Sequence, residues 1–186
     1  MNGRFEGVCP SFQHSLSLSL TATIPGLNPD RKTFGTFLRT DMAHIQPTKL
    51  DAAHFDSKAR QWDDNPVFRE RGLMIGEAIR KAVPLQRSMS ALDYGCGTGL
   101  LSFPLKNELG SILMADSSGG MLEVVNEKIA ALGVSNMSTM KIDFHSDPHP
   151  AQRFDLIVTS MTLHHVPDTD HILQVFHDLL NPGGCI

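Results

Sequence analysis

Cysteine is scarce in this chain, and positive charge is not in excess. The three cysteines, Cys9, Cys96 and Cys185, lie far apart, and this spacing excludes a disulfide framework and a C-x-x-C zinc site. The 16 Lys and Arg residues are outnumbered by 20 Asp and Glu residues, which argues against a nucleic-acid-binding surface. No apolar run approaches the roughly 18 residues of a membrane span. We therefore expect a soluble cytoplasmic protein with no metal, no nucleic acid and no membrane as a partner.

The first 41 residues do not have the pattern of a folded domain. Residues 15–20 alternate serine and leucine, but prolines at 10, 25 and 29 interrupt the surrounding segment. We expect residues 1–41 to be either an upstream extension, in which case Met42 is the biological start, or a disordered tail. A mitochondrial targeting segment is a weaker alternative, because acidic residues accompany the arginines and serines. Residues 42–186 are expected to form one domain, long enough to bury a core.

The most informative segment is residues 91–99, ALDYGCGTG. A short apolar strand carries Asp93, and Gly95, Gly97 and Gly99 then follow at alternate positions. Glycines let the backbone turn sharply and approach a ligand closely, and a following helix would direct its free N–H groups into that turn. Leu100 stands where the dinucleotide pattern requires a third glycine or alanine, which disfavours a nicotinamide-dependent oxidoreductase. The pattern indicates a nucleoside-like cofactor at the carboxyl end of a parallel sheet.

Further segments follow the glycine loop in a recognisable order. Residues 111–116 form an apolar run that ends in an acid about 20 residues past the loop, where nucleotide-binding folds place a ribose-binding carboxylate. The remaining segments are DSSGGML at 116–122, KIDF at 141–144, FDLIVTS at 154–160 with LHHVPD at 163–168, and LNPGG at 180–184. Over residues 55–186, this series resembles the class I S-adenosylmethionine-dependent methyltransferases, within the small-molecule, methyltransferase type 11 or UbiE-like group.

Both the residue pattern and the resemblance predict an α/β fold. Helical stripes at 68–83, 121–132 and 172–179 alternate with short apolar runs, which predicts a parallel sheet covered on both faces. The resemblance implies a Rossmann-like, doubly wound, mostly parallel sheet. Because the chain stops at the expected start of the fifth strand, we expect the C-terminal strands to be missing. A truncated product, a homo-oligomer or a partner chain along the open edge would each be consistent with this end. Pro104 is expected to kink the helix after the glycine loop.

The resemblance also assigns the cofactor S-adenosyl-L-methionine and its site. Asp93 would help to hold the ammonium group, Asp116 would accept from both ribose hydroxyls, and Asp143 would accept from the adenine amino group. Phe144 would offer its backbone N–H to the ring, and Met121 either packs near the adenine or is a plain core residue. The full set of expected cofactor-binding residues is Asp93, Gly95, Gly97, Gly99, Asp116, Ser117, Met121, Asp143, Phe144 and Ser160.

The expected reaction is in-line methyl transfer to a small-molecule acceptor, in which the protein mainly positions the reactants and excludes water. His164 and His165 are the candidates for a general base, because imidazole titrates near neutrality; a packing role for this pair is the alternative. Trp62 is expected either to close over the site or to anchor a helix. The competing functional hypotheses are a non-catalytic cofactor-binding or interaction protein and, less favoured, an NAD(P)-dependent oxidoreductase.

Overall fold

A computed structural model of the chain describes residues 52–186, so the expectations for residues 1–41 and for Met42 lie outside the described residues. The described part begins with three consecutive helical elements: α1 (Ala52–Lys58), the 3-10 helix η2 (Ala59–Asp64) and α2 (Pro66–Ala82). The start of α2 is encoded locally, because the Asn65 side chain accepts a hydrogen bond from the Val67 amide and Pro66 occupies the first helical position. The predicted helix over 68–83 is thus confirmed.

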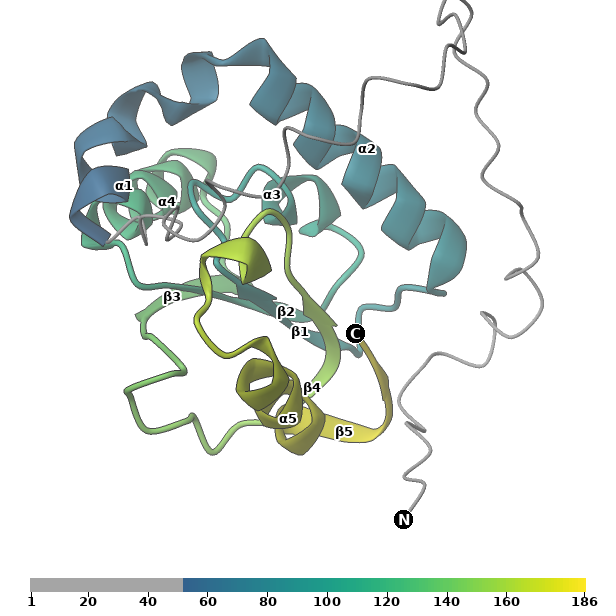
Figure 1. Cartoon of the computed structure of the whole chain (residues 1–186). Coiled ribbons are helices and arrows are strands. Elements are labelled where there is room, and N and C mark those ends of the chain that lie inside the picture. The colour runs from purple at the N-terminus through teal and green to yellow at the C-terminus, as the bar shows by residue number, and fades with distance from the viewer. Residues whose placement is uncertain (1–51) are drawn as a thin grey trace, which may run out of the picture.

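A five-stranded parallel sheet forms the centre of the molecule (Figure 1). Its strands are β1 (Ser90–Tyr94), β2 (Ser111–Asp116), β3 (Met137–Lys141), β4 (Phe154–Val158) and β5 (Leu180–Cys185), arranged in the order β3-β2-β1-β4-β5. All four neighbouring pairs are parallel. The order reverses between β1 and β4, and such a switch point opens a crevice at the carboxyl ends of the strands. The predicted Rossmann-like α/β fold is confirmed.

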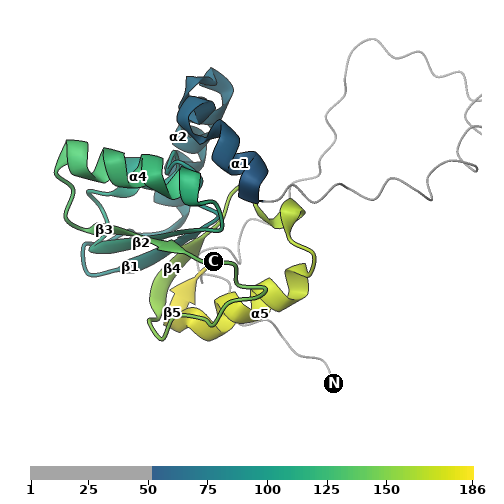
Figure 2. The ribbon, with the colours of Figure 1, turned by 90° about the vertical axis from the view of Figure 1, so that its left-hand side faces the viewer.

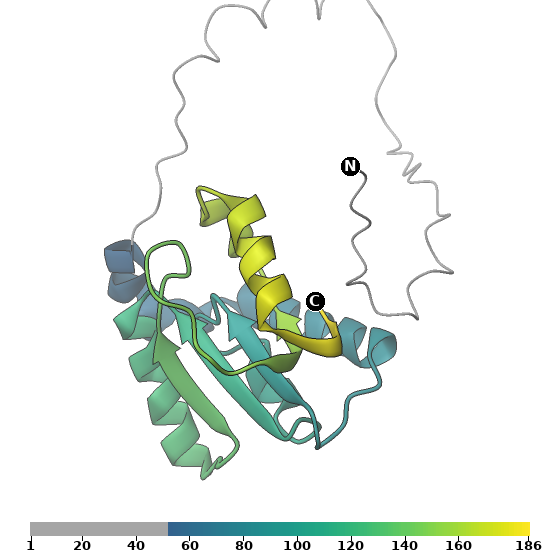
Figure 3. The same cartoon turned by 90° about the horizontal axis from the view of Figure 1, so that it is seen from below.

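Helices cover both faces of the sheet (Figure 2). The elements α1, α2 and α4 (Gly119–Leu132) lie on one side, and α5 (Thr169–Leu179) lies on the other. The short helix α3 (Ser102–Leu105) shares the core cluster of α4 through Leu105. Figure 3, viewed from below, shows α5 over one part of the sheet. Each face has its own core: Met114 and Val125 belong to the cluster under α4, and Phe154 and Phe176 belong to the cluster under α5.

The structure corrects the prediction for the segment after the glycine loop. A helix kinked at Pro104 was expected there, but α3 has only 4 residues, with Pro104 as the third. Proline has no amide hydrogen with which to continue a helix, and the Lys106 amide, two residues further on, donates to the Phe103 carbonyl only three residues back. A helix this short cannot supply a strong N-terminal dipole, so the loop itself and its neighbours must hold a ligand.

Three smaller boundaries also differ from expectation. The third strand ends at Lys141, so Asp143 lies just beyond it. The chain was expected to stop at the start of the fifth strand, but the LNPGG segment at 180–184 already belongs to β5, which pairs with β4 only at Leu180 and Cys185 around an irregularity. Leu132, the last member of the α4 stripe, is 60% exposed. β5 is the edge of the described sheet, and β4 lies next to it.

Candidate functional site

The glycine loop leaves β1 in a conformation that glycine permits and other residues resist. Gly95, Gly97 and Gly99 have φ angles of 70°, 53° and 83°, in the left-handed region where a Cβ is unfavourable. The amides of Gly95 and Cys96 donate to the Ala115 carbonyl at the end of β2, at 2.8 and 3.1 Å. The turn is therefore fixed to the neighbouring strand before any ligand arrives.

Asp116 holds the middle of this loop. One oxygen of its carboxylate accepts from the Gly97 amide at 2.8 Å, and the other accepts from the Ser118 amide, also at 2.8 Å. A Cβ added at Gly97 would meet no atom within 4 Å, so a side chain there would enter open space in front of the loop. The backbone at Gly97 is consequently exposed to whatever binds in front of it.

That open space belongs to a cavity of about 480 Å³ at the carboxyl ends of β1, β2 and β4. A volume of this size is typical of a small-molecule or cofactor site. Most of the residues predicted from the sequence line it: Asp93, Gly95, Gly97, Asp116, Ser117, Met121, Asp143, Ser160, His164 and His165. The structure thus brings together residues from six separate segments of the chain.

Gly99 and Phe144 do not line this cavity. A Cβ at Gly99 would collide with the side chains of Met114 and Phe103, so this glycine allows the loop to pack against the core. The Phe144 ring is 1% exposed and stacks on Tyr94 with centroids 4.8 Å apart. The suggested contact between the Phe144 amide and an adenine ring stays a prediction.

Met121 fits both of the roles considered for it. Its side chain is 1% exposed and therefore part of the core, and it also lines the cavity. Asp143 is half-buried, and one of its carboxylate oxygens accepts from the His145 amide at 3.0 Å. This bond fixes the turn after β3 and leaves the second oxygen of Asp143 able to accept from a ligand.

The two acids nearest the glycine loop are held in an environment that favours protonation. Asp93 is 1% exposed, and burial raises its pKa to about 7, with the nearby Asp116 charge adding to the effect. The Ser102 hydroxyl, which donates to Asp93 at 2.6 Å, opposes this rise. Burial also raises the pKa of Asp116, against the lowering effect of its backbone hydrogen bonds. A cationic ligand group would relieve this unfavourable concentration of negative charge.

Three aromatic side chains from the N-terminal helical elements form an aromatic wall in the lining of the cavity. Phe55 from α1, Trp62 from η2 and Phe68 from α2 all line it. Trp62 lies 4.8 Å from Phe68 and 6.0 Å from Phe55, measured between ring centroids. Trp62 therefore contributes to covering the site and also anchors η2 against α2. A wall of this kind excludes water, which strengthens electrostatic interactions inside the cavity.

The segment that carries this wall is tied to the glycine loop by Asp63, which the sequence analysis did not single out. One Asp63 oxygen accepts from the Thr98 hydroxyl at 2.5 Å, and the other pairs with the Lys128 ammonium at 2.5 Å. The same ammonium donates to the Thr98 carbonyl at 2.7 Å. Thr98 is 1% exposed, so this network fixes a buried loop residue from two directions.

Asp56 provides a second tie that the sequence analysis missed. Its carboxylate accepts from the Ser118 hydroxyl at 2.6 Å and from the Gly120 amide at 2.8 Å, at the start of α4. These bonds hold the pKa of Asp56 below its usual value. Asp56 lies on α1 and Asp63 lies on η2, and only the fold shows which partners these two side chains meet.

The two candidate bases lie at the mouth of the cavity. His164 and His165 belong to the 3-10 helix η3 (Leu163–His165), which follows β4. Burial, followed by repulsion from His164 and His54, lowers the pKa of His165. The His165 ring meets the edge of Phe55 with centroids 5.3 Å apart. Just before η3, Met161 has a φ of 59°, an uncommon conformation for a residue that carries a side chain.

The described residues support neither a cysteine nucleophile nor a metal site in this cavity. Cys96 is buried, and burial raises the pKa of its thiol well above the usual value, which makes it a small packing residue rather than a nucleophile. His145 and His149 lie outside the cavity lining. Across residues 52–186, no three His, Cys, Asp or Glu side chains gather as a metal ion would require. None of the helices in this part has the length and apolarity to cross a bilayer.

A glycine loop, a carboxylate at the end of β2 and a cavity at the switch point together define a nucleoside-cofactor-binding α/β domain. Comparison with known proteins makes this class specific. Residues 91–184 match the family described as "Methyltransferase domain". The chain belongs to this family, the class I S-adenosylmethionine-dependent methyltransferases, and S-adenosylmethionine is the cofactor that its site fits.

Individual relatives share about a third of their aligned residues with the chain. Aklanonic acid methyltransferase DauC of Streptomyces sp. (strain C5) is 34% identical over 98 residues, which cover 51% of this chain and 44% of the relative. Ubiquinone/menaquinone biosynthesis C-methyltransferase UbiE of Pseudoalteromonas translucida is 33% identical over 104 residues, covering 54% and 41%. The chain thus spans about half the length of the curated relatives it matches.

A solved structure supports the same fold. A SAM-dependent methyltransferase from Aquifex aeolicus superimposes with a TM-score of 0.58 at 25% identity, covering 68% of each chain. The shared fold extends well beyond the glycine loop, in agreement with the parallel sheet described above.

Proposed function

We propose that this chain is the cofactor-binding part of a methyltransferase that moves a methyl group from S-adenosylmethionine to a small-molecule acceptor by in-line displacement. The observation that carries the proposal is the pairing of Asp116 with the Gly97 amide, 2.8 Å apart, at the floor of a 480 Å³ cavity at the switch point. This pairing presents backbone and a carboxylate to the same ligand. The cofactor supplies an already activated methyl group, so no covalent intermediate with the protein is needed.

The cavity offers each part of the cofactor a suitable group. Each oxygen of the Asp116 carboxylate accepts one backbone amide and can accept again, which suits a ribose with two hydroxyls. Asp93, whose pKa of about 7 reflects its buried position, gains most from a neighbouring ammonium group. Asp143 is proposed to accept from the adenine amino group, with Ser117, Met121 and Ser160 completing the lining.

The nature of the acceptor is inferred from the site and from the relatives. The aromatic wall of Phe55, Trp62 and Phe68 suits a planar or aromatic molecule. One relative is named for aklanonic acid and another for ubiquinone and menaquinone biosynthesis. We therefore place the acceptor among small aromatic or quinonoid compounds, with no nucleic acid or membrane partner. A cytoplasmic location, and a second chain along the β5 edge, stay predictions.

His165 is the better of the two candidate bases. Burial lowers its pKa, which favours the neutral imidazole that can take a proton from an acceptor hydroxyl or an activated carbon. His164, with its ring centroid 3.9 Å away, would position it.

Transfer of a labelled methyl group tests the proposed function. In separate reactions, the full chain is incubated with S-[methyl-14C]adenosylmethionine together with a small phenol, a quinol or an aromatic acid. Extraction of the label into the small-molecule fraction is expected, and Gly97→Val should eliminate it. Tight cofactor binding without transfer to any probe would instead support the non-catalytic binding protein. Binding of NADPH in preference to the adenosyl compounds would overturn the cofactor assignment.

A further inference from the structure

Arg71 lies where α2 makes its closest approach to the glycine loop. The neighbouring residue, Gly72, packs so tightly there that an added Cβ would lie 2.6 Å from the Leu100 carbonyl oxygen. Arg71 is half-buried and lines the cavity. Its guanidinium carbon is 5.9 Å from the centroid of the Phe68 ring, within the range in which a cation is attracted to an aromatic face. The aromatic wall therefore holds a positive charge at the edge of the cofactor cavity.

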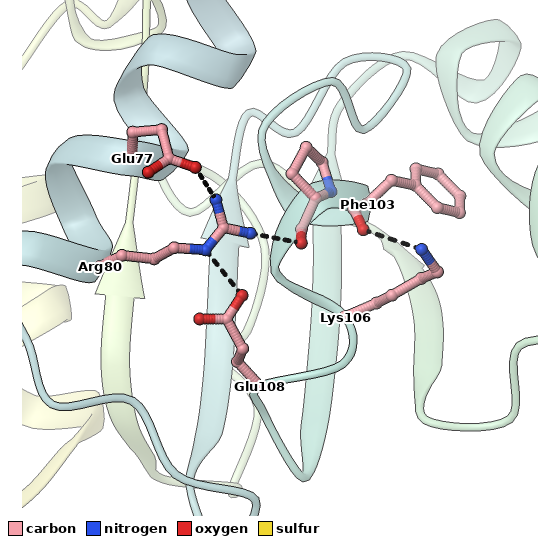
Figure 4. Close-up of polar contacts among 6 residues, drawn as sticks. Glu77, Arg80, Phe103, Lys106 and Glu108 are labelled. Atoms are coloured by element: carbon pink, nitrogen blue, oxygen red, sulfur yellow. Dashed lines mark hydrogen bonds and ion pairs between the residues drawn. The ribbon is translucent and has the colours of Figure 1, made fainter.

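Within residues 52–186, no hydrogen bond or ion pair engages the guanidinium of Arg71. Arg80, nine residues later on α2, is a part-buried arginine with a structural role, and its contacts provide a comparison. Arg80 donates to Glu108 at 2.7 Å, to Glu77 at 2.6 Å and to the Pro104 carbonyl at 2.7 Å (Figure 4). A guanidinium has five N–H donors in a fixed fork, and leaving them unpaired in a half-buried position is costly. Arg71 is thus arranged to receive an acceptor group from a ligand.

The charges around the cavity indicate which kind of group this is. Its lining includes three carboxylates, Asp93, Asp116 and Asp143, and Arg71 is the only lysine or arginine in the lining. A ligand carboxylate would be repelled almost everywhere in this cavity, because like charges are unfavourable where water is excluded. Beside Arg71 it would be bound by two parallel hydrogen bonds, the geometry that guanidinium and carboxylate share.

We propose that Arg71 is the carboxylate-binding residue of this cavity. Two sources present the same chemistry: the α-carboxylate of the cofactor's methionine part, and an acid group on the methyl acceptor. The proposal rests on the proposed function, since it takes the cavity to be the cofactor and acceptor site. Arg71 is then a positive subsite in a site whose other charged groups are acidic. The ligand carboxylate is bound by α2 and not by the glycine loop.

Calorimetric titration of the full chain with two adenosyl compounds tests the first source. S-adenosylhomocysteine carries the α-carboxylate, whereas 5′-methylthioadenosine lacks the whole amino-acid part. Arg71→Gln should weaken S-adenosylhomocysteine binding roughly tenfold to a hundredfold, as loss of a charged hydrogen-bonded pair does, and leave 5′-methylthioadenosine binding unchanged. Arg71→Lys should restore part of the affinity. Arg87→Gln is the matched control, because it removes the same charge from an exposed position outside the cavity.

A second titration, in the presence of saturating S-adenosylhomocysteine, tests the acceptor as the source. Benzoate and salicylate are compared with the neutral benzamide as probes. If Arg71 binds an acceptor carboxylate, the wild-type chain should prefer the acids, and Arg71→Gln should lose that preference while binding S-adenosylhomocysteine normally. Variants with unchanged affinity for both S-adenosylhomocysteine and the acids would overturn the proposal. A folded wild-type chain that binds neither adenosyl compound would instead refute the proposed function, and this proposal with it.

Discussion

Asp93 is expected to make the stability of this domain fall as the pH rises toward neutrality. Its side chain is 1% exposed, accepts a single hydrogen bond from Ser102 at 2.6 Å, and lies near a second acid, Asp116. These surroundings raise the pKa from 3.8 to about 7. The folded state consequently binds a proton at Asp93 over a range in which the unfolded chain has already released it.

The size and sign of the effect follow from this shift in pKa. Three pKa units correspond to on the order of 4 kcal/mol. Because the folded pKa lies above the unfolded value, the stabilisation is fully present below pH 3.8 and is lost as the pH rises through about 7. Between pH 5 and 7 the contribution of Asp93 should therefore fall by about 2 kcal/mol. Above pH 8 the contribution of Asp93 to the unfolding free energy should no longer change with pH.

Urea denaturation of the full chain between pH 5 and 8 measures this contribution, with Asp93→Asn as the perturbation. Asparagine keeps the shape and can still accept from the Ser102 hydroxyl, but it does not titrate. The difference in unfolding free energy between the two proteins isolates Asp93 from the ionisable groups that both proteins share. Asp64→Asn, at an exposed position on η2, controls for the loss of a charge. If wild type and Asp93→Asn show the same pH profile, the buried-acid reasoning is refuted.

Three further predictions concern the glycine loop and its supports. Asp63→Ala should lower the unfolding free energy by about 2–4 kcal/mol in chemical denaturation, because it leaves the buried Thr98 hydroxyl without an acceptor. The control is Arg60→Ala, which breaks an exposed ion pair worth at most about 1 kcal/mol. A loss for Asp63→Ala no larger than that of the control would contradict the proposed tie. Gly97→Val should abolish S-adenosylhomocysteine binding in calorimetry, and retained affinity would show that the ligand does not approach this backbone. Asp116→Ala should weaken that binding by about 2–3 kcal/mol, and unchanged affinity would rule out the ribose contact.

The sequence predicted the parallel sheet, and most of the site residues predicted from it line the cavity, because both depend on local patterns. The apolar runs at 111–115 and 154–158 are strands, and the helical stripe at 121–132 is α4, which ends at Gly133 with a φ of 61°. Asp93, Asp116 and Asp143 each lie at or just after the end of a strand. Since parallel strands have their carboxyl ends at one edge, such residues must converge, and the structure brings all three into one cavity.

The parts that the sequence did not predict depend on contacts between distant segments. Asp63 and Lys128 are 65 positions apart, and nothing in either neighbourhood indicates that they meet at Thr98. Arg71 lies on a helix with several other charged residues, most of them on the solvent side. Only the fold shows that Arg71 faces the cavity and that Arg80 is fully paired. The failed prediction after the glycine loop has a similar origin, since the apolar pattern gave no measure of how soon α3 would end.

The most direct test of the account is calorimetric titration of S-adenosylhomocysteine into the full chain and into its Gly97→Val variant, with folding of both monitored by circular dichroism. The account predicts saturable micromolar binding to the wild-type chain at a stoichiometry of one, and no binding to the folded variant. A folded wild-type chain that gives no binding heat and shows no stabilisation by the compound would contradict the claim that this cavity is the cofactor site.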